Sequence, residues 1–551
     1  KDMLCRADEE AGDKTAIRYY TNFAEKQTRD VTYHEFRHEV GCLGTGLAAL
    51  GITADHVAMV SENRYEWILA YLTILCTEGV WVPVDKELPF PEILNILAHS
   101  DSKVVFFSSH YEEKFREAAD KLPWIKYFVG IDMNAEDEGG RFISMKSVMA
   151  HGEELLAAGD NAFTSLEPKD EDLRMLVYTS GTTGIAKGVM LSLHNLVSSV
   201  YYGLEVSTVF ERCLSVLPYH HTYEAVCGIL VSLHHHSTIC VNDSLRHVAE
   251  NMKFFKPDYI LLVPLFVENL YKKIMSGIEA KGKAKAFEKL IKTSNAMRKV
   301  GIDMRKTLFK SVHDVFGGEI IKLVCGGAPI RPELAGFFDA VGINLINGYG
   351  ITECSPLVSV NRDYYSDYRS VGVTLPCCEV KIDEPNEDGE GEICVKGDVV
   401  MMGYYNDPYS TADVFTDGWF RTGDLGHLNK DGSLTITGRK KNLIILSNGE
   451  NVSPEEIEYQ LARIPEIKEV VVYTEGNLIV AEIFPEENEM TDADLKAVLQ
   501  ERINDYNAPQ PSHKRVNKVK IRKSEFEKTT THKIKRYKVL EKSKKEHEKE
   551  S

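Results

Sequence analysis

Residues 178–188 read Tyr178-Thr179-Ser180-Gly181-Thr182-Thr183-Gly184-Ile185-Ala186-Lys187-Gly188. Apolar runs at residues 173–177 and 189–191 lie on either side, and each run indicates a short buried strand. Glycines let backbone N–H groups approach an anion closely, hydroxyls add uncharged donors, and the one lysine adds positive charge. We interpret the stretch as a polyphosphate cradle; the alternative is a flexible surface hairpin. The candidate phosphate-binding residues are Thr179, Ser180, Gly181, Thr182, Thr183, Gly184 and Lys187.

The cradle differs from a Walker A loop, which needs Gly-Lys-Ser/Thr in direct succession. Here Lys187 lies between Ala186 and Gly188. The stretch instead resembles the signature loop of the adenylate-forming superfamily, which includes acyl-CoA synthetases, firefly luciferase and peptide-synthetase adenylation domains. The family loop has proline where this chain has Ala186, a change that removes no hydrogen-bond donor. Six motifs occur in the family's order, and the resemblance covers nearly the whole chain.

The length and composition bound the class of protein. At 551 residues the chain exceeds one hydrophobic core, so we expect two or more domains. A formal charge of −18 argues against nucleic acid as a general partner. Eleven cysteines without Cys-x-x-Cys pairs suit a reducing compartment. The chain has neither an apolar run of about 18 residues nor a secretory signal pattern, so we predict a cytoplasmic protein. Peripheral membrane contact and the oligomeric state stay open.

The first hundred residues alternate helical and strand patterns. Thr32 with Glu35 three positions later has the form of a capping box. Residues 57–60, 66–76 and 80–85 read as strand, helix and strand, which predicts a βαβ unit in a parallel sheet. We therefore expect an α/β fold whose large N-terminal domain consists of parallel-type subdomains, and we assign this region to the scaffold.

Two histidines follow an apolar strand pattern at residues 214–217. They lie at a strand end, where the sites of α/β folds gather. By resemblance, this position carries an aromatic residue beside the reacting carboxylate. His221 matches it best by spacing, and His220 is the alternative. A solvent-exposed histidine pair without a catalytic role is the other interpretation. The sequence around this pair is more similar to long-chain fatty acyl synthetases than to acetyl-CoA synthetases. His234-His235-His236 we interpret as a surface cluster, because three consecutive residues cannot all face one metal ion.

Two further glycine-rich turns follow strand patterns. Close glycines at Gly326-Gly327-Ala328 would let a flat ring lie against the backbone, and the family uses this turn to hold adenine. Residues 345–353 then present an aromatic ring, a hydroxyl and a carboxylate at fixed offsets. By resemblance, adenine contacts come from Asn347, Gly348, Tyr349 and Gly350, Thr352 binds the α-phosphate, and Glu353 holds Mg²⁺. One carboxylate is enough for this role, since phosphate oxygens and water complete the Mg²⁺ octahedron.

From residue 389 to 438 the pattern changes to short strands with Asp-Gly turns, which predicts a small antiparallel, barrel-like subdomain. Within it, Asp424 is similar to the family's ribose clamp, and a carboxylate can accept hydrogen bonds from both hydroxyls of a diol. Arg439 resembles the arginine that contacts ribose and phosphate, and Lys441 occupies the hinge position. We place the boundary here, with domains at residues 1–440 and 441–551.

The helix and strand patterns of the last 110 or so residues predict a small α+β domain. A capping box with proline in the first turn is expected at residues 453–456, before a helix with one apolar face. Residues 527–536 resemble the family's terminal catalytic-lysine motif, although His532 replaces the usual glycine. Lys533 is the predicted catalytic lysine and Lys535 is the second choice. A solvated basic tail is the alternative interpretation.

These motifs together predict an ATP-dependent fatty acid–CoA ligase. By resemblance, the carboxylate attacks the α-phosphate of ATP to give acyl-AMP and pyrophosphate, and the coenzyme A thiol then displaces AMP. Lys533 bridges the carboxylate and the α-phosphate, and the C-terminal domain then rotates about Lys441. The alternatives are an acyl-AMP ligase that loads a carrier protein and a non-catalytic nucleotide- or lipid-binding relative. The length of the acyl chain stays open.

Overall fold

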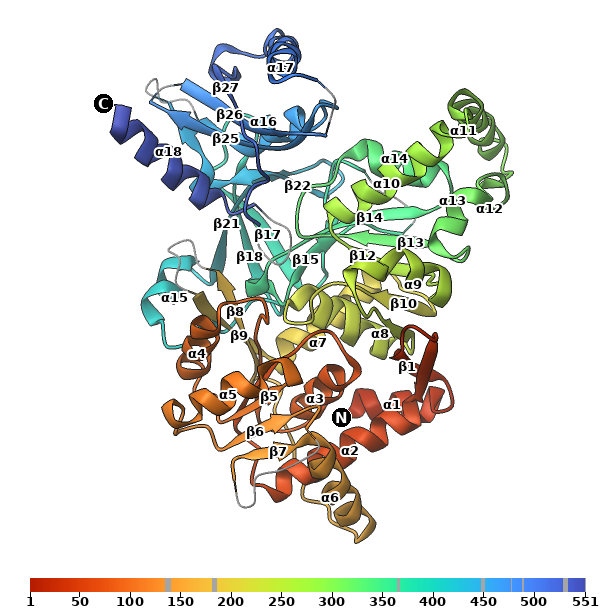
Figure 1. Cartoon of the computed structure of the whole chain (residues 1–551), viewed down its shortest axis with the longest axis vertical. Coiled ribbons are helices and arrows are strands. Elements are labelled where there is room, and N and C mark those ends of the chain that lie inside the picture. Colours follow the sequence, from red (N-terminus) through yellow and green to blue (C-terminus); the bar gives the residue numbers. More distant parts are fainter. Residues whose placement is uncertain are drawn as a thin grey trace. The chain divides into compact units, whose positions relative to one another are not determined.

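The structure of the protein is a computed structural model that describes residues 1–133, 140–180, 186–363, 367–446, 451–476, 478–487, 490–528 and 534–550. The chain divides into two compact units (Figure 1). Unit 1 holds Lys1–Glu379 and Val395–Phe420, and unit 2 holds Val380–Cys394 and Arg421–Ser551. The boundary after residue 440 stays a prediction.

Unit 1 contains two large sheets whose inner strands are parallel. The eight-stranded sheet has the order β19-β9-β8-β4-β3-β5-β6-β7, and the nine-stranded sheet has the order β16-β15-β14-β13-β12-β10-β11-β1-β2. Antiparallel pairs lie toward the sheet edges. The strands are β1 (Thr15–Asn22), β2 (Gln27–Thr32), β3 (His56–Val60), β4 (Val80–Pro83), β5 (Val104–Phe107), β6 (Tyr127–Gly130), β7 (Phe142–Ser144), β8 (Leu173–Ser180), β9 (Ala186–Ser192), β10 (Arg212–Ser215), β11 (Thr238–Val241), β12 (Tyr259–Leu262), β13 (Lys322–Cys325), β14 (Asn344–Gly350), β15 (Leu357–Val360), β16 (Val373–Thr374) and β19 (Gly403–Tyr404).

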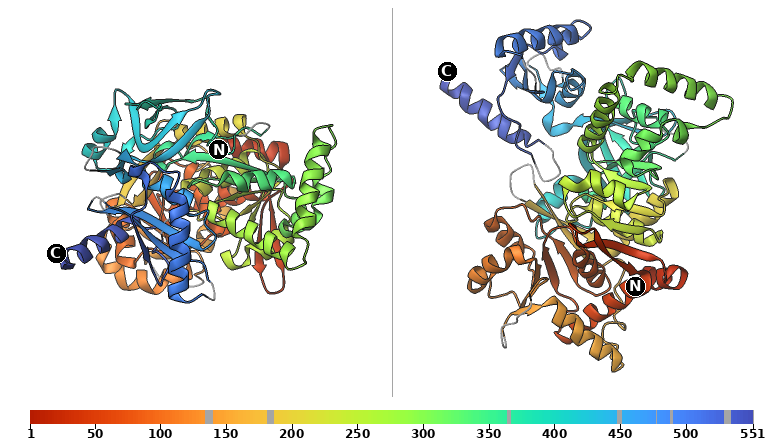
Figure 2. Two further views of the ribbon diagram at one scale, coloured as in Figure 1. Left: turned by 90° about the horizontal axis from the view of Figure 1, so that it is seen from above. Right: turned by 45° about the vertical axis from the view of Figure 1, so that its right-hand side comes forward.

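Helices pack around these sheets (Figures 1 and 2). The α-helices of unit 1 are α1 (Asp2–Ala11), α2 (Tyr33–Ala49), α3 (Tyr65–Leu75), α4 (Phe90–His99), α5 (Glu112–Ala118), α6 (Met145–Ala157), α7 (Leu193–Val206), α8 (Val231–His234), α9 (Val248–Phe255), α10 (Pro264–Glu279), α11 (Ala284–Arg298), α12 (Arg305–Leu308), α13 (Lys310–His313), α14 (Pro332–Ala340) and α15 (Pro408–Val414). A π-helix, η3 (Tyr223–Leu230), leads into α8, and 3₁₀ turns include η6 (Thr352–Cys354). No helix among the described residues is both long and apolar enough to cross a bilayer.

The predicted βαβ unit is confirmed by β3, α3 and β4, with β3 and β4 parallel. The capping box at the start of α2 is also confirmed. The Thr32 hydroxyl accepts from the Glu35 N–H at 3.1 Å, and the Glu35 carboxylate accepts from the Thr32 N–H at 2.8 Å. Ser192 caps α7 in a reciprocal arrangement with Asn195. These local signals hold because each cap satisfies backbone N–H groups that the helix itself leaves without partners.

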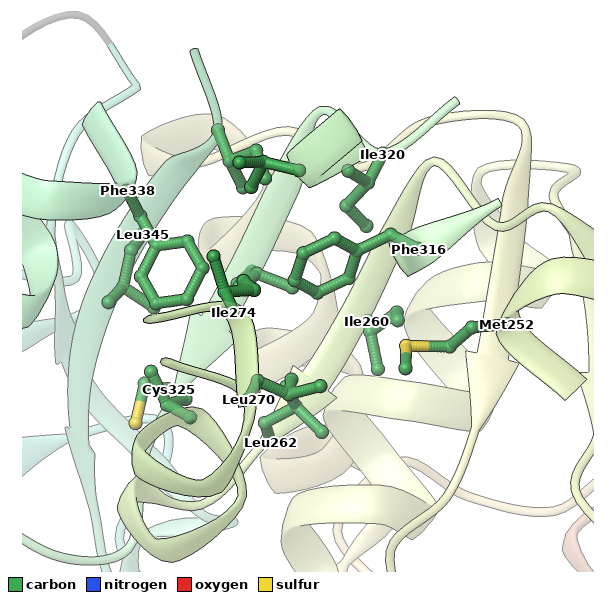
Figure 3. Packing of buried hydrophobic residues seen from close by; sticks show 14 of the residues in the cluster. Met252, Ile260, Leu262, Leu270, Ile274, Phe316, Ile320, Cys325, Phe338 and Leu345 are labelled. Atoms are coloured by element: carbon green, nitrogen blue, oxygen red, sulfur yellow. The ribbon is translucent and has the colours of Figure 1, made fainter. Parts of the chain in front are cut away.

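Each large sheet has its own apolar core. In the nine-stranded sheet, strands β10 to β14 contribute residues such as Ile260, Leu262 and Leu345, which pack against α9, α10 and α14 (Figure 3). Phe338 of α14 and Ile274 of α10 meet over these strands. Strands buried on both faces read as continuous apolar runs, which is why they could be found in the sequence.

Unit 2 contains a three-stranded sheet with helices on both faces. The strand order is β25-β26-β27; α16 and α17 share one apolar core with the sheet, and Val539 of α18 belongs to the cluster around Val471 and Val480. The expected α+β arrangement is therefore present. Its elements are β23 (Ile444–Ile445), β24 (Asn451–Val452), α16 (Pro454–Leu461), β25 (Ile467–Glu475), β26 (Leu478–Pro485), α17 (Asp492–Asn507), β27 (Lys518–Ile521) and α18 (Arg536–Glu550).

The capping box predicted at residues 453–456 is wrong. Helix α16 begins at Pro454 as expected, but the Ser453 side chain makes no cap hydrogen bond. Its hydroxyl instead lies 3.0 Å from the Thr437 carbonyl oxygen and 3.2 Å from Glu455 Oε2. The hydroxyl thus donates to the carbonyl of another strand instead of accepting from an N–H group of its own helix.

Short strands form a five-stranded sheet between residues 378 and 439. The order is β17-β18-β21-β20, with β22 paired to β21. At the predicted Asp-Gly turn, Asp417 and Gly418 both have positive φ, 51° and 78°, as a tight hairpin turn requires. The strands are β17 (Cys378–Asp383), β18 (Gly391–Gly397), β20 (Phe415–Thr416), β21 (Trp419–Leu428) and β22 (Leu434–Arg439).

Candidate active site

The predicted cradle is an antiparallel hairpin formed by β8 and β9. Its strands extend further toward the tip than the sequence suggests, because Thr179 pairs with Lys187 and Ser180 with Ala186. Thr179, Ser180 and Lys187 therefore belong to strands. The tip, with Gly181, Thr182, Thr183 and Gly184, lies outside the described residues, and its role stays a prediction.

Lys187 is held by two residues from a distant part of the chain. Its Nζ donates to the Ser410 hydroxyl at 2.8 Å and lies 4.8 Å from the centre of the Tyr404 ring. Tyr404 is fixed by backbone pairing, since β19 joins β9 with Tyr404 opposite Val189. A cation over an aromatic face is attracted by the ring quadrupole. The ammonium group is thus positioned at the start of β9.

Tyr404 also contacts the predicted Mg²⁺ ligand. Its hydroxyl donates to Glu353 Oε1 at 3.0 Å, and the Met401 N–H donates to the Glu353 carbonyl oxygen at 2.9 Å. Burial and the nearby carboxylate raise the pKa of the Tyr404 phenol well above its usual value. The phenol therefore remains a proton donor at neutral pH. One tyrosine links the lysine of the cradle to the carboxylate of the downstream motif.

The predicted adenine contacts lie on neighbouring strands, β13 and β14. Asn347 is buried, and its Oδ1 has no hydrogen-bond partner among the described residues. Its backbone is fixed through Asn361, whose Oδ1 accepts from the Asn347 N–H at 2.8 Å. A buried amide oxygen without a donor is costly unless a ligand supplies one. The exocyclic amino group of adenine is a suitable donor.

The glycine-rich turn after β13 meets an aromatic ring. A Cβ at Gly326 would lie 3.2 Å from Tyr223 Cζ, so only glycine fits against this ring without displacing it. Gly327 has φ +83°, a conformation that favours glycine, and Ala328 is exposed. Gly348, Tyr349 and Gly350 lie in β14 itself, and only 8% of Tyr349 is exposed.

The histidine pair follows β10, and its two ring centroids are 4.2 Å apart. Burial lowers the pKa of His220 to about 3, with a smaller contribution from Lys86, so this imidazole is neutral at physiological pH. The His221 carbonyl accepts from the N–H groups of Glu224 and Ala225, at 3.1 and 3.0 Å. His221 therefore starts the turn into π-helix η3. Which ring lies beside a substrate carboxylate stays a prediction.

Asn63 holds this histidine turn, a role that the sequence did not reveal. Its Nδ2 donates to the Leu217 carbonyl at 2.7 Å, and its Oδ1 accepts from the Tyr219 N–H at 3.1 Å. The residue lies just after strand β3, in a region that the sequence assigns to scaffold. A polar residue directly after a parallel strand is the signal that could have indicated it.

Unit 2 places the predicted ribose contacts opposite each other. Asp424 on β21 pairs in register with Arg439 on β22, and Arg439 Nε lies 2.8 Å from Asp424 Oδ1. Asp424 is buried whereas Arg439 is exposed. Lys441 is exposed in a 3₁₀ turn, Lys440–Asn442, directly after β22.

A buried carboxylate lies beside this pair, and no motif in the sequence indicates it. Glu392 on β18 contacts Arg421 at 2.5 Å and Lys440 at 2.7 Å. Burial alone would raise its pKa, but the two cations hold the pKa of Glu392 below its usual value. Glu392 therefore orders the chain on both sides of Asp424. Only the fold brings these residues together, since Glu392 lies 29 residues before Arg421 and 48 before Lys440.

The terminal lysine motif is described only in part. Lys533 lies outside the described residues. Lys535 is half-buried, and its backbone N–H donates to the Glu527 carbonyl at 2.7 Å. Lys528 and Ile534 form an isolated antiparallel bridge. No cluster of three or more His, Cys, Asp or Glu side chains suited to a metal occurs among the described residues. His234 and His236 instead contact Arg6 and Glu10.

The fold defines a class, an α/β protein of two units with parallel sheets in unit 1. The chain belongs to the AMP-binding enzyme family. The family model matches residues 5–405, and the model of the AMP-binding enzyme C-terminal domain matches residues 441–549. The protein is therefore an adenylate-forming ligase that resembles acyl-CoA synthetases, as the motifs predicted.

Curated relatives give finer likenesses. The long-chain-fatty-acid–CoA ligase FadD15 of Mycobacterium tuberculosis is 30% identical over 465 residues, which covers 80% of this chain and 75% of the relative. Long-chain-fatty-acid–CoA ligase 6 of Mus musculus is 29% identical over 481 residues, with 80% and 67% covered.

Solved structures confirm the fold alone, because their sequence identities are low. The anthranilate CoA ligase AuaEII in complex with anthranoyl-AMP superposes with a TM-score of 0.79 at 19% identity, covering 98% of this chain and 96% of that one. ATP-bound MatB from Rhodopseudomonas palustris gives a TM-score of 0.77 at 22% identity, with 99% of each chain covered.

Proposed function

We propose that this protein activates a long-chain fatty acid as its acyl adenylate and then transfers the acyl group to coenzyme A. The observation that carries the proposal is the contact of Tyr404 with both Lys187 and Glu353. It joins a cation suited to phosphate to a carboxylate suited to Mg²⁺. The relatives named as long-chain-fatty-acid–CoA ligases support the substrate class.

The described groups fit ATP. The Asn347 Oδ1, which has no partner among the described residues, suits the adenine amino group, and at Gly326 a Cβ would press on the Tyr223 ring from 3.2 Å. In unit 2, Asp424 suits a ribose diol, because a carboxylate accepts from two hydroxyls at once. Glu353 would hold Mg²⁺ together with phosphate oxygens and water. When bound, the ion neutralises phosphate charge and orients the polyphosphate.

The chemistry needs no protein nucleophile. The fatty acid carboxylate attacks the α-phosphorus, the bond to the β,γ-pyrophosphate breaks, and the thiol of coenzyme A later displaces AMP. The chain's own contribution is positioning and charge neutralisation. Lys187 anchors the leaving pyrophosphate, Thr352 contacts the α-phosphate, and a ring of the His220–His221 pair lines the carboxylate side. Lys533 bridges the carboxylate and the α-phosphate during the first step.

The decisive test is a panel of carboxylic acids from acetate to stearate, with AMP, pyrophosphate and thioester measured with and without coenzyme A. We expect AMP and acyl-CoA to accumulate with the longer acids and only when coenzyme A is present. Pyrophosphate release without any thioester would contradict transfer to coenzyme A and favour a carrier-protein acceptor. Turnover confined to short or aromatic acids would contradict the substrate class, and nucleotide binding without AMP release on any acid would contradict catalysis.

A further inference from the structure

Helix α11 and its flanks concentrate positive charge in an acidic protein. Residues 281–310 contain ten Lys or Arg residues and two acidic residues, a net charge of +8, whereas the whole chain carries −18. The segment includes α11, the loop after it and α12. In Figure 1 and in both views of Figure 2, α11 lies at the margin of unit 1. The positive charge is therefore gathered on one protruding element.

The lysines of α11, together with the lysine at its C-cap, share one face of the helix. They recur at intervals of four, three and seven residues, which places them on a single stripe. All are exposed, and the ion pairs that the structure describes in this region involve other residues. The stripe consists of Lys285, Lys289, Lys292 and Lys299.

The opposite face of α11 is attached to the fold. Phe287, Leu290 and Ile291 pack against the core of the nine-stranded sheet. Arg298 forms an ion pair with Asp339 of α14 at 2.8 Å. The basic cluster thus divides into cations that fasten the helix and cations that point to solvent. The exposed Glu288 is the one acidic residue of α11, so lysines outnumber carboxylates on the outer face of the helix.

An exposed apolar turn follows the stripe directly. Val300, Ile302 and Met304 are 73%, 49% and 41% exposed, and they alternate along five residues of loop between α11 and α12. Single exposed apolar residues are common on protein surfaces. Here three exposed apolar residues lie in one turn next to four lysines that pair with no described residue. The surface is therefore both apolar and basic.

We propose that this α11 surface, formed by the four stripe lysines with Val300, Ile302 and Met304, docks on an anionic phospholipid bilayer. Ammonium groups are attracted to acidic headgroups, and apolar side chains enter the boundary between headgroups and acyl chains. A nucleic acid would engage the lysines but gain nothing from the apolar turn. An anionic bilayer is the partner that interacts favourably with both the lysines and the apolar turn. The proposal is independent of the catalytic assignment, since its test measures binding alone.

The test is co-sedimentation of the whole protein with vesicles of phosphatidylcholine, with or without phosphatidylserine. Wild type should bind only the vesicles that contain phosphatidylserine, and added salt should weaken binding. Changing Lys285, Lys289, Lys292 and Lys299 to Gln should weaken binding by roughly 100-fold or more at low salt. V300S/I302S/M304S should lower binding at every salt concentration, because it removes the part that salt does not screen.

The matched control neutralises four exposed lysines elsewhere on unit 1, K121Q/K146Q/K169Q/K253Q, with the same change in net charge. It should bind within about threefold of wild type, since only lysines close to the membrane surface contribute to attraction. Equal loss in the control and stripe variants would overturn the proposal, as would failure of wild type to bind anionic vesicles. Stripe-dependent binding to a DNA duplex without vesicle binding would also overturn it. Circular dichroism and thermal unfolding confirm that each variant is folded.

Discussion

Tyr404 occupies a position between two charged groups that bind the same substrate in our proposal. Its ring face lies under the Lys187 ammonium, and its hydroxyl donates to Glu353. A hydrogen bond to an ionised group contributes about 1.5–3 kcal/mol, more than a bond between neutral groups. The hydroxyl and the ring can be separated by mutation, so the two contacts can be tested one at a time.

Tyr404→Phe should lower ATP–pyrophosphate exchange about tenfold at limiting Mg²⁺ and raise the Mg²⁺ concentration needed for half-maximal exchange. The ring remains beneath Lys187, so the change affects the position of the carboxylate and leaves the cation contact in place. Exchange is measured against Mg²⁺ concentration at saturating ATP. Tyr405→Phe is the matched control, because the hydroxyl of that neighbour donates to Asp101 instead. An unchanged Mg²⁺ dependence in the Tyr404 variant would contradict the role.

Glu224 is a buried carboxyl group in π-helix η3. The Ser215 hydroxyl donates to its Oε1 at 2.5 Å, while its Oε2 has no partner among the described residues. Burial raises the pKa of Glu224 to about 8 from 4.5. Between these values the folded chain keeps this proton and the unfolded chain releases it. The free energy of unfolding therefore falls as pH rises, by up to about 1.4 kcal/mol per pH unit.

Glu224→Gln should remove this pH dependence, because the amide has the same shape and no charge to bury. Thermal unfolding of wild type and variant is compared near pH 5 and near pH 8. We expect the variant to gain several degrees in Tm relative to wild type at the higher pH. Glu205→Gln changes an exposed carboxylate and should leave the comparison unchanged. Parallel pH profiles of the Glu224 variant and wild type would show that this carboxyl group is ionised in the folded protein.

At the scale of elements, the sequence predicts strands and caps well where the signal is local. The β3–α3–β4 unit and the Thr32 cap follow from apolar periodicity and from two residues three positions apart. The cradle strands β8 and β9 run further than the glycines suggest, because pairing of Thr179 with Lys187 satisfies backbone groups near the tip. Two-residue strand β19 could not be predicted, since it has no periodicity and pairs with a strand some 200 residues earlier.

The candidate site shows the same division. Lys187, Glu353 and Asp424 could be found because they follow recognisable motifs. Asn63, Tyr404 and Glu392 could not, because each acts through a partner that only the tertiary fold brings close. The cap at Ser453 failed for this reason too, since the hydroxyl binds a distant carbonyl.

The turn between β13 and α14 provides a test at this scale. Gly326→Ala places a Cβ 3.2 Å from the Tyr223 ring, which must move by a few tenths of an ångström. We expect the KM for ATP in pyrophosphate exchange to rise several-fold while the protein remains folded. Gly277→Ala in α10 meets no neighbouring atom within 4 Å and should stabilise the helix by roughly 1 kcal/mol without changing KM. Equal KM values for both variants would show that this turn does not contact the nucleotide.

At the scale of the whole molecule, predicted nucleotide contacts come from both units of one chain. Unit 1 carries the cradle and the adenine turn, and unit 2 carries Asp424, Arg439 and the terminal lysine motif. Adenylation and thioester formation have different charge requirements. The nucleophile attacks the α-phosphorus in the first step and the acyl carbonyl carbon in the second, so a cation that bridges the carboxylate and the α-phosphate should be dispensable in the second.

Lys533→Ala should therefore lower ATP–pyrophosphate exchange by about 10²–10³-fold, the usual cost of removing one preorganised charge from a transition state. Thioester formation from supplied acyl-AMP and coenzyme A should change by less than about threefold, because no phosphoanhydride bond breaks in that step. Lys535→Ala is the control two residues away and should spare both half-reactions. Loss of exchange in the Lys535 variant and not in the Lys533 variant would assign the catalytic role to Lys535. Equal loss of both half-reactions in the Lys533 variant would show that this lysine supports the fold or coenzyme A binding instead of the attack on phosphorus.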